Sequence, residues 1–186
     1  CDALLPTGQV REAIDGIEVT LLDNGMPVVV VGAASVGIEG DESPGALEAD
    51  TRLRGLVEAI RLEAGRRMGL GDVAAKTVPK VSIVSAPRAG GTLTTRTFIP
   101  HRCHTAIGVL GALSVATAVE LPGSVAAEVA GPRLTNGAVR VEHPTGSFDV
   151  RAELRRAADG WQVERSHFDE VLLRAARDDV DLGFVE

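Results

Sequence analysis

Polar and apolar residues alternate along residues 17–22, and a run of four valines follows at residues 28–31. Between them stands the turn sequence Asp23-Asn24-Gly25, followed by Pro27. Because successive side chains of a strand point to opposite faces, the alternation indicates a strand. An Asn-Gly pair between two such runs is typical of a hairpin, so we predict two strands joined by a tight turn.

Apolar residues recur mostly at intervals of three and four between residues 46 and 68, which predicts an amphipathic helix over this range. The apolar positions are Leu53, Leu56, Val57, Ile60, Ala64 and Met68. Pro44 suits the entrance of the helix, and Gly69 suits its end. We expect the charged residues of this segment to form a solvated face; they are Arg52, Arg54, Glu58, Arg61 and Glu63.

Further strand-like segments are bounded by Gly, Pro or Asn and cover residues 80–85, 92–98, 138–142, 147–154 and 161–164. Residues 166–177 fit either a helix or a strand. No internal repeat and no low-complexity linker divides the sequence. We therefore expect residues 1–186 to form a single domain with antiparallel or mixed strands.

Residues 105–121 are apolar on every side of a helix, and Pro122-Gly123 follows them. A helix without a polar face must be surrounded by protein or by lipid. A membrane span needs about 20 apolar residues, and this segment is shorter and contains hydroxyl side chains and glycines. We therefore predict a central helix wrapped by strands. The expected fold class is α+β, with a mixed β-sheet curled around a central apolar helix.

Composition narrows the classes of function. Aromatic residues are 3% of the chain and the formal net charge is −7, so a nucleic-acid partner is not expected. Cys1 and Cys103 lie too far apart in sequence to predict a disulfide framework or a CxxC metal site. We expect a cytoplasmic protein that binds neither nucleic acid nor a membrane. A first residue that is Cys rather than Met is typical of a fragment.

One tract of the acidic chain is basic. Residues 73–119 contain no Asp or Glu, and their basic residues are Lys76, Lys80, Arg88, Arg96 and Arg102. Such a local field favours anionic ligands, although chance clustering in a strand-rich region explains the same pattern.

His101, Cys103 and His104 directly precede the predicted central helix. The first turn of a helix offers unpaired N–H groups and the positive end of its dipole, so this segment is the candidate anion site. The three residues lack the second ligand pair of a zinc site, and no metal is expected. For Cys103, a position at a helix N-terminus fits a reactive thiol and equally a small buried side chain.

Ordered motifs of unusual sequence run through most of the chain. They are Leu5-Pro6-Thr7-Gly8, Asp23-Asn24-Gly25-Met26-Pro27, Gly71-Asp72-Val73-Ala74-Ala75-Lys76, Pro79-Lys80, Ser85-Ala86-Pro87, Thr95-Arg96-Thr97-Phe98-Ile99-Pro100-His101-Arg102-Cys103-His104, Ile107-Gly108-Val109-Leu110-Gly111-Ala112 and His143-Pro144-Thr145-Gly146. Together they resemble the PrpF-like family. That family is similar in fold to diaminopimelate epimerase, in which each of two like domains curls a mixed sheet around a central helix. The resemblance spans about residues 4–148 and implies that this chain corresponds to the C-terminal domain, without the N-terminal one.

The resemblance implies an isomerase that moves a proton on a tricarboxylic keto acid in the degradation of gallate- or protocatechuate-type aromatic acids, with no cofactor and no metal. The acting Lys and Cys are expected in the missing N-terminal domain, so no catalytic residue is assigned to this chain. The implied substrate-binding residues are Met26, Arg96, His101, Cys103, His104 and Thr105. The expected partners are the small tricarboxylate substrate and the missing domain, with a homodimer left open. Two alternatives remain: another isomerase of aconitate-type tricarboxylates, and a stand-alone module that binds carboxylates.

Overall fold

An eight-stranded mixed sheet forms the middle of the structure, a computed structural model that describes residues 3–152, 154–157 and 160–163. Its strands are β1 (Glu12–Ile14), β2 (Ile17–Asp23), β3 (Pro27–Gly32), β4 (Lys80–Ser85), β5 (Leu93–Ile99), β6 (Arg102–Cys103), β7 (Val139–His143) and β8 (Gly146–Val150). They follow the order β1-β2-β3-β4-β5-β7-β8, and β6 pairs with β5 beside this path. A separate antiparallel pair consists of β9 (Leu154–Ala157) and β10 (Gly160–Val163).

Most neighbouring strands run antiparallel, whereas β3 with β4 and β5 with β7 run parallel. The predicted mixed sheet is therefore confirmed, and so is the hairpin of β2 and β3. The strand predicted over residues 147–154 ends at Val150, where its partner β7 begins at Val139. The strands β1 and β6 were not predicted, because three and two residues are too few to show a period. Residues 166–177 lie outside the described residues.

Two helices, α1 (Pro44–Ala49) and α2 (Thr51–Arg67), replace the single helix predicted over residues 46–68. Asp50 separates them because its backbone is extended, with φ −75° and ψ 95°, and its carboxylate accepts a hydrogen bond from the Leu53 N–H at 2.9 Å. Such an N-cap satisfies a backbone donor that the first turn leaves free. The apolar period continues across the break, so the pattern alone did not locate it.

Arg61 corrects the expectation that all charged residues of α2 are solvated. Its side chain is 0% exposed, and it forms two hydrogen bonds with Glu58, at 2.7 Å and 2.8 Å. Its Nη1 atom donates to the carbonyl oxygens of Val73 and Lys76 at 3.0 Å and 3.2 Å. Because the segment between α2 and β4 folds back over this side of the helix, the guanidinium fork satisfies several acceptors inside the protein.

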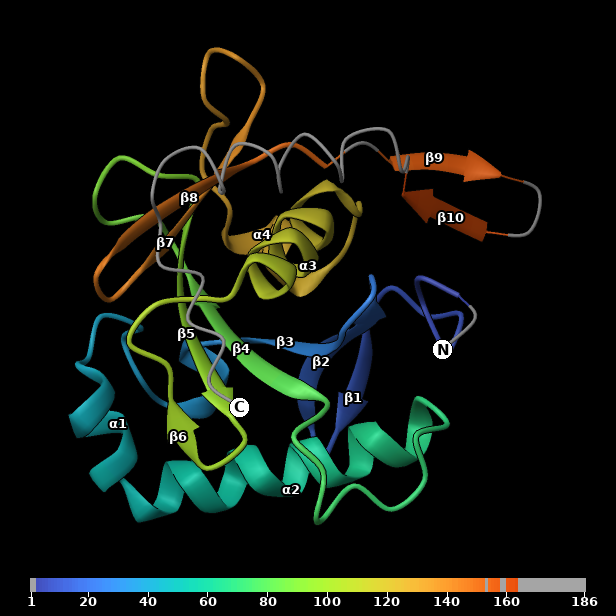
Figure 1. Ribbon diagram of the computed structural model, residues 1–186, viewed down its shortest axis with the longest axis vertical. Coiled ribbons are helices and arrows are strands. Elements are labelled where there is room, and N and C mark those ends of the chain that lie inside the picture. The colour runs from blue at the N-terminus through green and yellow to red at the C-terminus, as the bar shows by residue number, and fades with distance from the viewer. Residues whose placement is uncertain (1–2, 153, 158–159, 164–186) are drawn as a thin grey trace.

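Each face of the sheet carries its own apolar core, and Figure 1 shows α2 on one side of the sheet and α3 and α4 on the other. On one face, α2 packs on alternate residues of the strands, among them Val29, Val31 and Phe98. On the other face, α3 (Val109–Glu120) and α4 (Val125–Val129) pack on the intervening residues, among them Val28 and Val30. A short 3₁₀ helix, η1 (Ala34–Val36), follows β3.

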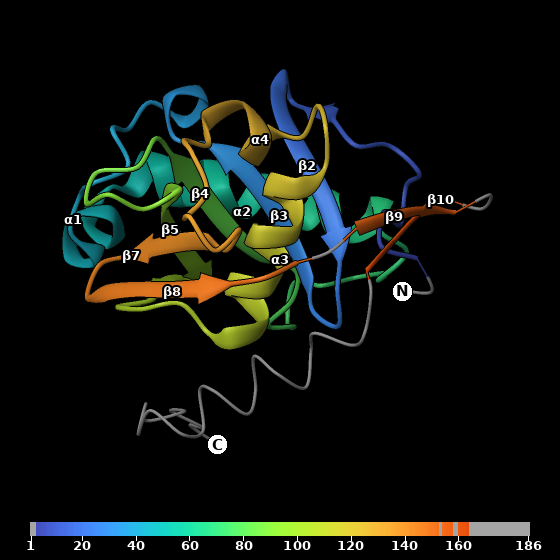
Figure 2. The same cartoon turned by 90° about the horizontal axis from the view of Figure 1, so that it is seen from above.

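The predicted central helix is confirmed by α3. Its residues 111–118 are buried, and it contacts β2 and β3 near one end of the strand order and β7 and β8 at the other, so the sheet curls around it (Figures 1 and 2). Within the part of the chain that the structure describes, no helix is long and apolar enough to cross a membrane. The helix starts at Val109 rather than at residue 105. The His104 N–H still pairs with the carbonyl oxygen of Thr97 at 2.8 Å, and the backbone of Gly108 is extended.

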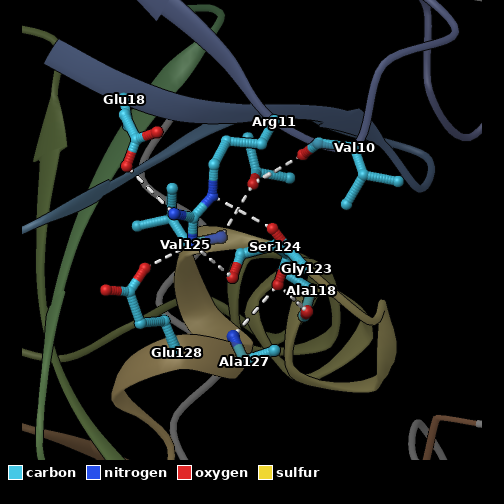
Figure 3. A network of polar contacts seen from close by, with 10 residues as sticks. Val10, Arg11, Glu18, Ala118, Gly123, Ser124, Val125, Ala127 and Glu128 are labelled. Carbon is cyan, nitrogen blue, oxygen red and sulfur yellow. Dashed lines mark hydrogen bonds and ion pairs between the residues drawn. The ribbon is translucent and has the colours of Figure 1, made fainter.

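Arg11 connects the C-terminal end of α3 to the sheet (Figure 3). Its guanidinium donates to the carbonyl oxygens of Gly123 at 3.0 Å and Ser124 at 3.1 Å, directly after α3. It also pairs with Glu18 of β2 at 2.9 Å and with Glu128 of α4. One side chain thus holds the sheet, the α3–α4 turn and α4 together, which helps to fix the position of α3 above the strands.

Candidate functional site

The start of α3 lies above one end of the sheet. The pairing of Val28 with Lys80 and of Val81 with Phe98 brings the β2–β3 turn, the start of β4 and the end of β5 to the same end. The Met26 methyl group lies 3.6 Å from the position that a Cβ atom on Gly111 would take. Met26 therefore reaches the first turn of α3, and this end of the sheet forms the floor of the candidate site.

Hydrogen bonds connect the segment before α3 to the β7–β8 turn. The Thr145 hydroxyl donates to the carbonyl oxygen of Thr105 at 3.0 Å and lies 3.3 Å from Nδ1 of His143. The Ala106 N–H donates to Nδ1 of His104 at 3.0 Å. These contacts bring His104 and His143 to the same side of the molecule, although about 40 residues separate them in sequence.

Lys80, His104 and His143 form what we call the basic cluster. Burial lowers the pKa of Lys80. Burial also lowers the pKa of His104, and the charge of Lys80 lowers it further. For His143, burial is again the largest cause of the lowered pKa, followed by the charges of His104 and Arg96. Each charge that shifts the pKa of either histidine is positive, so a bound anion would relieve a repulsion here.

The structure brings together three of the six substrate-binding residues implied by the sequence. Met26, His104 and Thr105 all lie near the start of α3. Lys80 and His143 were not on that list. The sequence carried a signal for Lys80, because strand alternation places it on the same face of β4 as Val84, which packs in the α3 core. In the sequence, His143 belongs to the motif His143-Pro144-Thr145-Gly146, which is typical of a turn first and of a site second, and nothing local links it to His104.

Arg96 and Cys103 lie on the opposite face of the sheet. Arg96 is buried and donates to the carbonyl oxygens of Glu42 at 2.7 Å and Thr95 at 2.8 Å. Cys103 packs in the same core as α2, and burial raises the pKa of its thiol to about 11. Because only the thiolate is a strong nucleophile, this geometry favours the small buried side chain over the reactive thiol.

His101 also lies apart from the basic cluster, on an exposed turn with its Nδ1 atom 3.9 Å from a carboxylate oxygen of Glu58 on α2. The basic residues of the tract from residue 73 to residue 119 also lie apart from one another in the structure. Lys76 donates to the carbonyl oxygen of Leu70, and Arg88 pairs with Asp41. Of the Lys and Arg residues of that tract, Lys80 alone belongs to the basic cluster. Among the residues that the structure describes, no group of three or more His, Cys, Asp or Glu side chains is arranged to hold a metal ion.

Comparison with known proteins defines the class to which this fold and site belong. The chain matches the model of the PrpF protein family over residues 1–181, and it belongs to that family. It is 54% identical over 158 residues to 4-oxalomesaconate tautomerase of Pseudomonas putida. This match covers 83% of this chain and 43% of the relative. It is 51% identical to (4E)-oxalomesaconate Delta-isomerase of Novosphingobium sp., over 86% of this chain and 45% of the relative. A third relative, 2-methyl-aconitate isomerase of Cupriavidus necator, is 30% identical over 94% of this chain and 48% of its own length.

The fold is also that of a solved structure, methylitaconate-delta-isomerase, with a TM-score of 0.77 and 21% sequence identity. The match covers 86% of this chain and 47% of that protein. The predicted α+β fold, a diaminopimelate-epimerase-like mixed sheet around a central helix, is therefore confirmed. The chain spans about half the length of the relatives that it matches.

Proposed function

We propose that this chain is the C-terminal half of an isomerase that converts the keto form of 4-oxalomesaconate into its dienol form, 4-carboxy-2-hydroxymuconate. Two relatives that are 54% and 51% identical to the chain carry names for chemistry on this substrate. The proposed setting is the breakdown of gallate- or protocatechuate-type aromatic acids. The observation that carries the proposal is the basic cluster beside the start of α3.

The proposed reaction is a proton transfer. A base removes a proton from the carbon next to the keto group, the electron pair forms a new carbon–carbon double bond, and the keto oxygen gains a proton. Three carboxylates accompany this centre, and negative charge develops on the keto oxygen during the transfer. Preorganised cations and N–H groups stabilise such charge. Lys80, His104 and His143 would therefore bind and orient carboxylates, with Thr105 and Met26 beside them.

The acid and the base of the reaction are proposed to lie in the half that relatives carry in addition to the matched part. This half of the site offers Lys80 and two imidazoles, and Cys103, the one thiol among the described residues, faces the α2 core with a raised pKa. General acid–base catalysis requires a group of suitable pKa within about 3 Å of the transferred proton. Arg96, His101 and Cys103 are not part of the proposed carboxylate site, because the structure places them on the α2 side of the sheet.

Two other functions make different predictions. An aconitate-type isomerase is favoured by the 30% identical relative that is named a 2-methyl-aconitate isomerase. Such an enzyme would prefer 2-methylaconitate to 4-oxalomesaconate when both are supplied to the protein with its other half. A stand-alone carboxylate-binding module would show binding and no turnover in either case.

The binding part of the proposal is tested by calorimetric titration with citrate, a stable tricarboxylate. We expect His104→Ala and Lys80→Met each to weaken binding about tenfold, since a charge-assisted hydrogen bond contributes about 1.5 kcal/mol or more. Lys76→Met removes the same charge from an exposed lysine bound to the Leu70 carbonyl, and we expect no change from it. Equal affinity in all four proteins would remove the basic cluster from the site.

The affinity for citrate should also depend on pH. The pKa values of His104 and His143 lie below their ordinary value of 6.5, so both imidazoles are largely neutral at pH 7. An anion favours the imidazolium form, and binding therefore raises both pKa values and takes up protons. Citrate itself gains a proton between about pH 8 and 5, the range in which histidine titrates. We therefore expect the ratio of the parent's affinity to that of His104→Ala to increase as the pH falls, because citrate protonation affects both proteins alike.

A further inference from the structure

A cavity of about 340 Å³ lies on the α2 side of the sheet, between that helix and the β5–β6 turn. It is lined by Thr51, Arg54, Gly55, Glu58, Phe98, Pro100 and His101. The residues from α2 follow the spacing i, i+3, i+4 and i+7, so they share one face of the helix. α3 and the basic cluster belong to the other face of the sheet, and the proposed function does not use this cavity.

Gly55 opens the cavity toward the helix backbone. A glycine inside a helix is less favourable than alanine, because its backbone loses more conformational freedom on folding. Close packing does not explain this glycine, because a Cβ atom built on it would meet nothing within 4 Å. The missing side chain instead leaves room beside the helix for a bound group.

The charges around the cavity favour an anion. Arg54 is exposed, and within the described residues its guanidinium has no hydrogen bond and no ion pair. The carboxylate of Glu58 is already occupied, because both of its oxygens accept hydrogen bonds from the buried Arg61. The imidazole of His101 lies at the rim, 3.9 Å from the nearer of these oxygens. A free guanidinium, an imidazole and the Thr51 hydroxyl thus surround an apolar surface at Pro100, with Phe98 buried beneath it at 1% exposure.

We propose that this cavity binds a small monocarboxylate with an apolar body. The carboxylate would contact Arg54 and His101 at the rim, and the apolar part would lie against Pro100 and the helix backbone at Gly55. One free guanidinium suits one carboxylate, whereas the three basic side chains beside α3 suit a ligand with several. The size of the cavity fits a small organic acid, since ligand pockets of proteins begin at about 300 Å³.

Benzoate is the probe for this site, titrated into the chain while binding is followed by calorimetry and by NMR. We expect saturable binding that Arg54→Gln weakens about tenfold, which corresponds to the loss of one charge-assisted contact. Gly55→Leu should abolish binding, because the new side chain fills the cavity. The same variant should unfold at a higher temperature, since leucine is the better helix former and its Cβ atom meets open space.

Matched controls separate this site from general effects. Gly45→Leu makes the same change in α1, also in open space, and Arg66→Gln removes an exposed charge at the far end of α2. Both should leave benzoate affinity unchanged, as should His104→Ala. The proposal is wrong if benzoate does not saturate, if Gly55→Leu still binds it, or if His104→Ala is the variant that loses it. Citrate binding at the basic cluster is measured separately, so a failure here leaves the proposed function standing.

Discussion

The guanidinium of Arg61 holds the segment between α2 and β4 against the helix. It is fully buried and bound on one side to Glu58 and on the other to the carbonyl oxygens of Val73 and Lys76. An unpaired buried charge is very unfavourable, and this one is compensated by a carboxylate and several carbonyl dipoles. Its hydrogen bonds are the largest cause of the lowered pKa of Glu58. The buried guanidinium is therefore stable only while Glu58 and the carbonyl oxygens all remain in place.

Replacing Arg61 by Met should therefore destabilise the protein by about 3 kcal/mol, since it leaves Glu58 and several buried carbonyls without their donor. Urea unfolding measures the change. Arg66→Met is the matched control on the same helix, and because that side chain is 71% exposed its loss should change stability by less than about 0.5 kcal/mol.

Because the pKa of Glu58 is lowered in the folded state, the pair of Glu58 and Arg61 stabilises the protein above the ordinary Glu pKa. That stability is lost as the pH falls through the lowered pKa, and Arg61→Met should remove this dependence.

Single residues were the least predictable part of the chain from sequence. In sequence, Arg61 lies among the other charged residues of α2, and nothing in the pattern distinguishes it from them. It is buried because residues 70–79 fold back over it. His104 and Thr105 could be proposed because they precede an apolar helix. His143 joins them through contacts of the β7–β8 turn with Thr105, which are formed only in the folded chain.

At the scale of elements, apolar periodicity predicted which segments are helical or extended, and local hydrogen bonds decided where they end. The period of residues 46–68 runs through Asp50, yet the chain turns there because the Asp50 carboxylate caps α2. Likewise, the apolar run that contains α3 begins four residues before the helix does. His104, the residue before the run, pairs with Thr97 of β5, and Thr105, its first residue, accepts a hydrogen bond from Thr145 of the β7–β8 turn. Caps and strand edges therefore limit what a periodic pattern can predict.

The cap of α2 supplies a prediction at this scale. Asp50→Ala should lower the free energy of unfolding by about 1 kcal/mol, because it removes the acceptor of the Leu53 N–H. Asp50→Asn keeps a side-chain oxygen in place and should recover most of the loss. Urea unfolding of the three proteins checks this. If Asp50→Ala is as stable as the parent, α1 and α2 do not depend on this cap for their separation.

At the scale of the whole molecule, one argument from sequence was sufficient to predict the architecture. A helix with no polar face had to be enclosed, and the strand-like segments around it had to enclose it. The sheet does curl around α3, with β2 and β3 on one part of it and β7 and β8 on another. The same enclosure leaves the start of α3 at the edge of the structure, next to the basic cluster. The proposed carboxylate site lies at that edge.

We therefore expect this chain to bind tricarboxylates without catalysing the proposed reaction at an enzymatic rate. It spans about half of each relative that it matches, and among the described residues its side of the site contains Lys80, His104 and His143 without a thiol or carboxylate poised to remove a proton. Binding without a positioned base gives little turnover, because proton transfer requires contact distance. An absorbance assay for dienol formation from 4-oxalomesaconate, run on this chain and on the 54% identical Pseudomonas putida tautomerase as the positive control, checks this. Turnover by the chain at a rate comparable to that enzyme would contradict the expectation. Lys80, His104 or His143 would then carry the acid–base chemistry. Assays of Lys80→Met, His104→Ala and His143→Ala would identify which residue does.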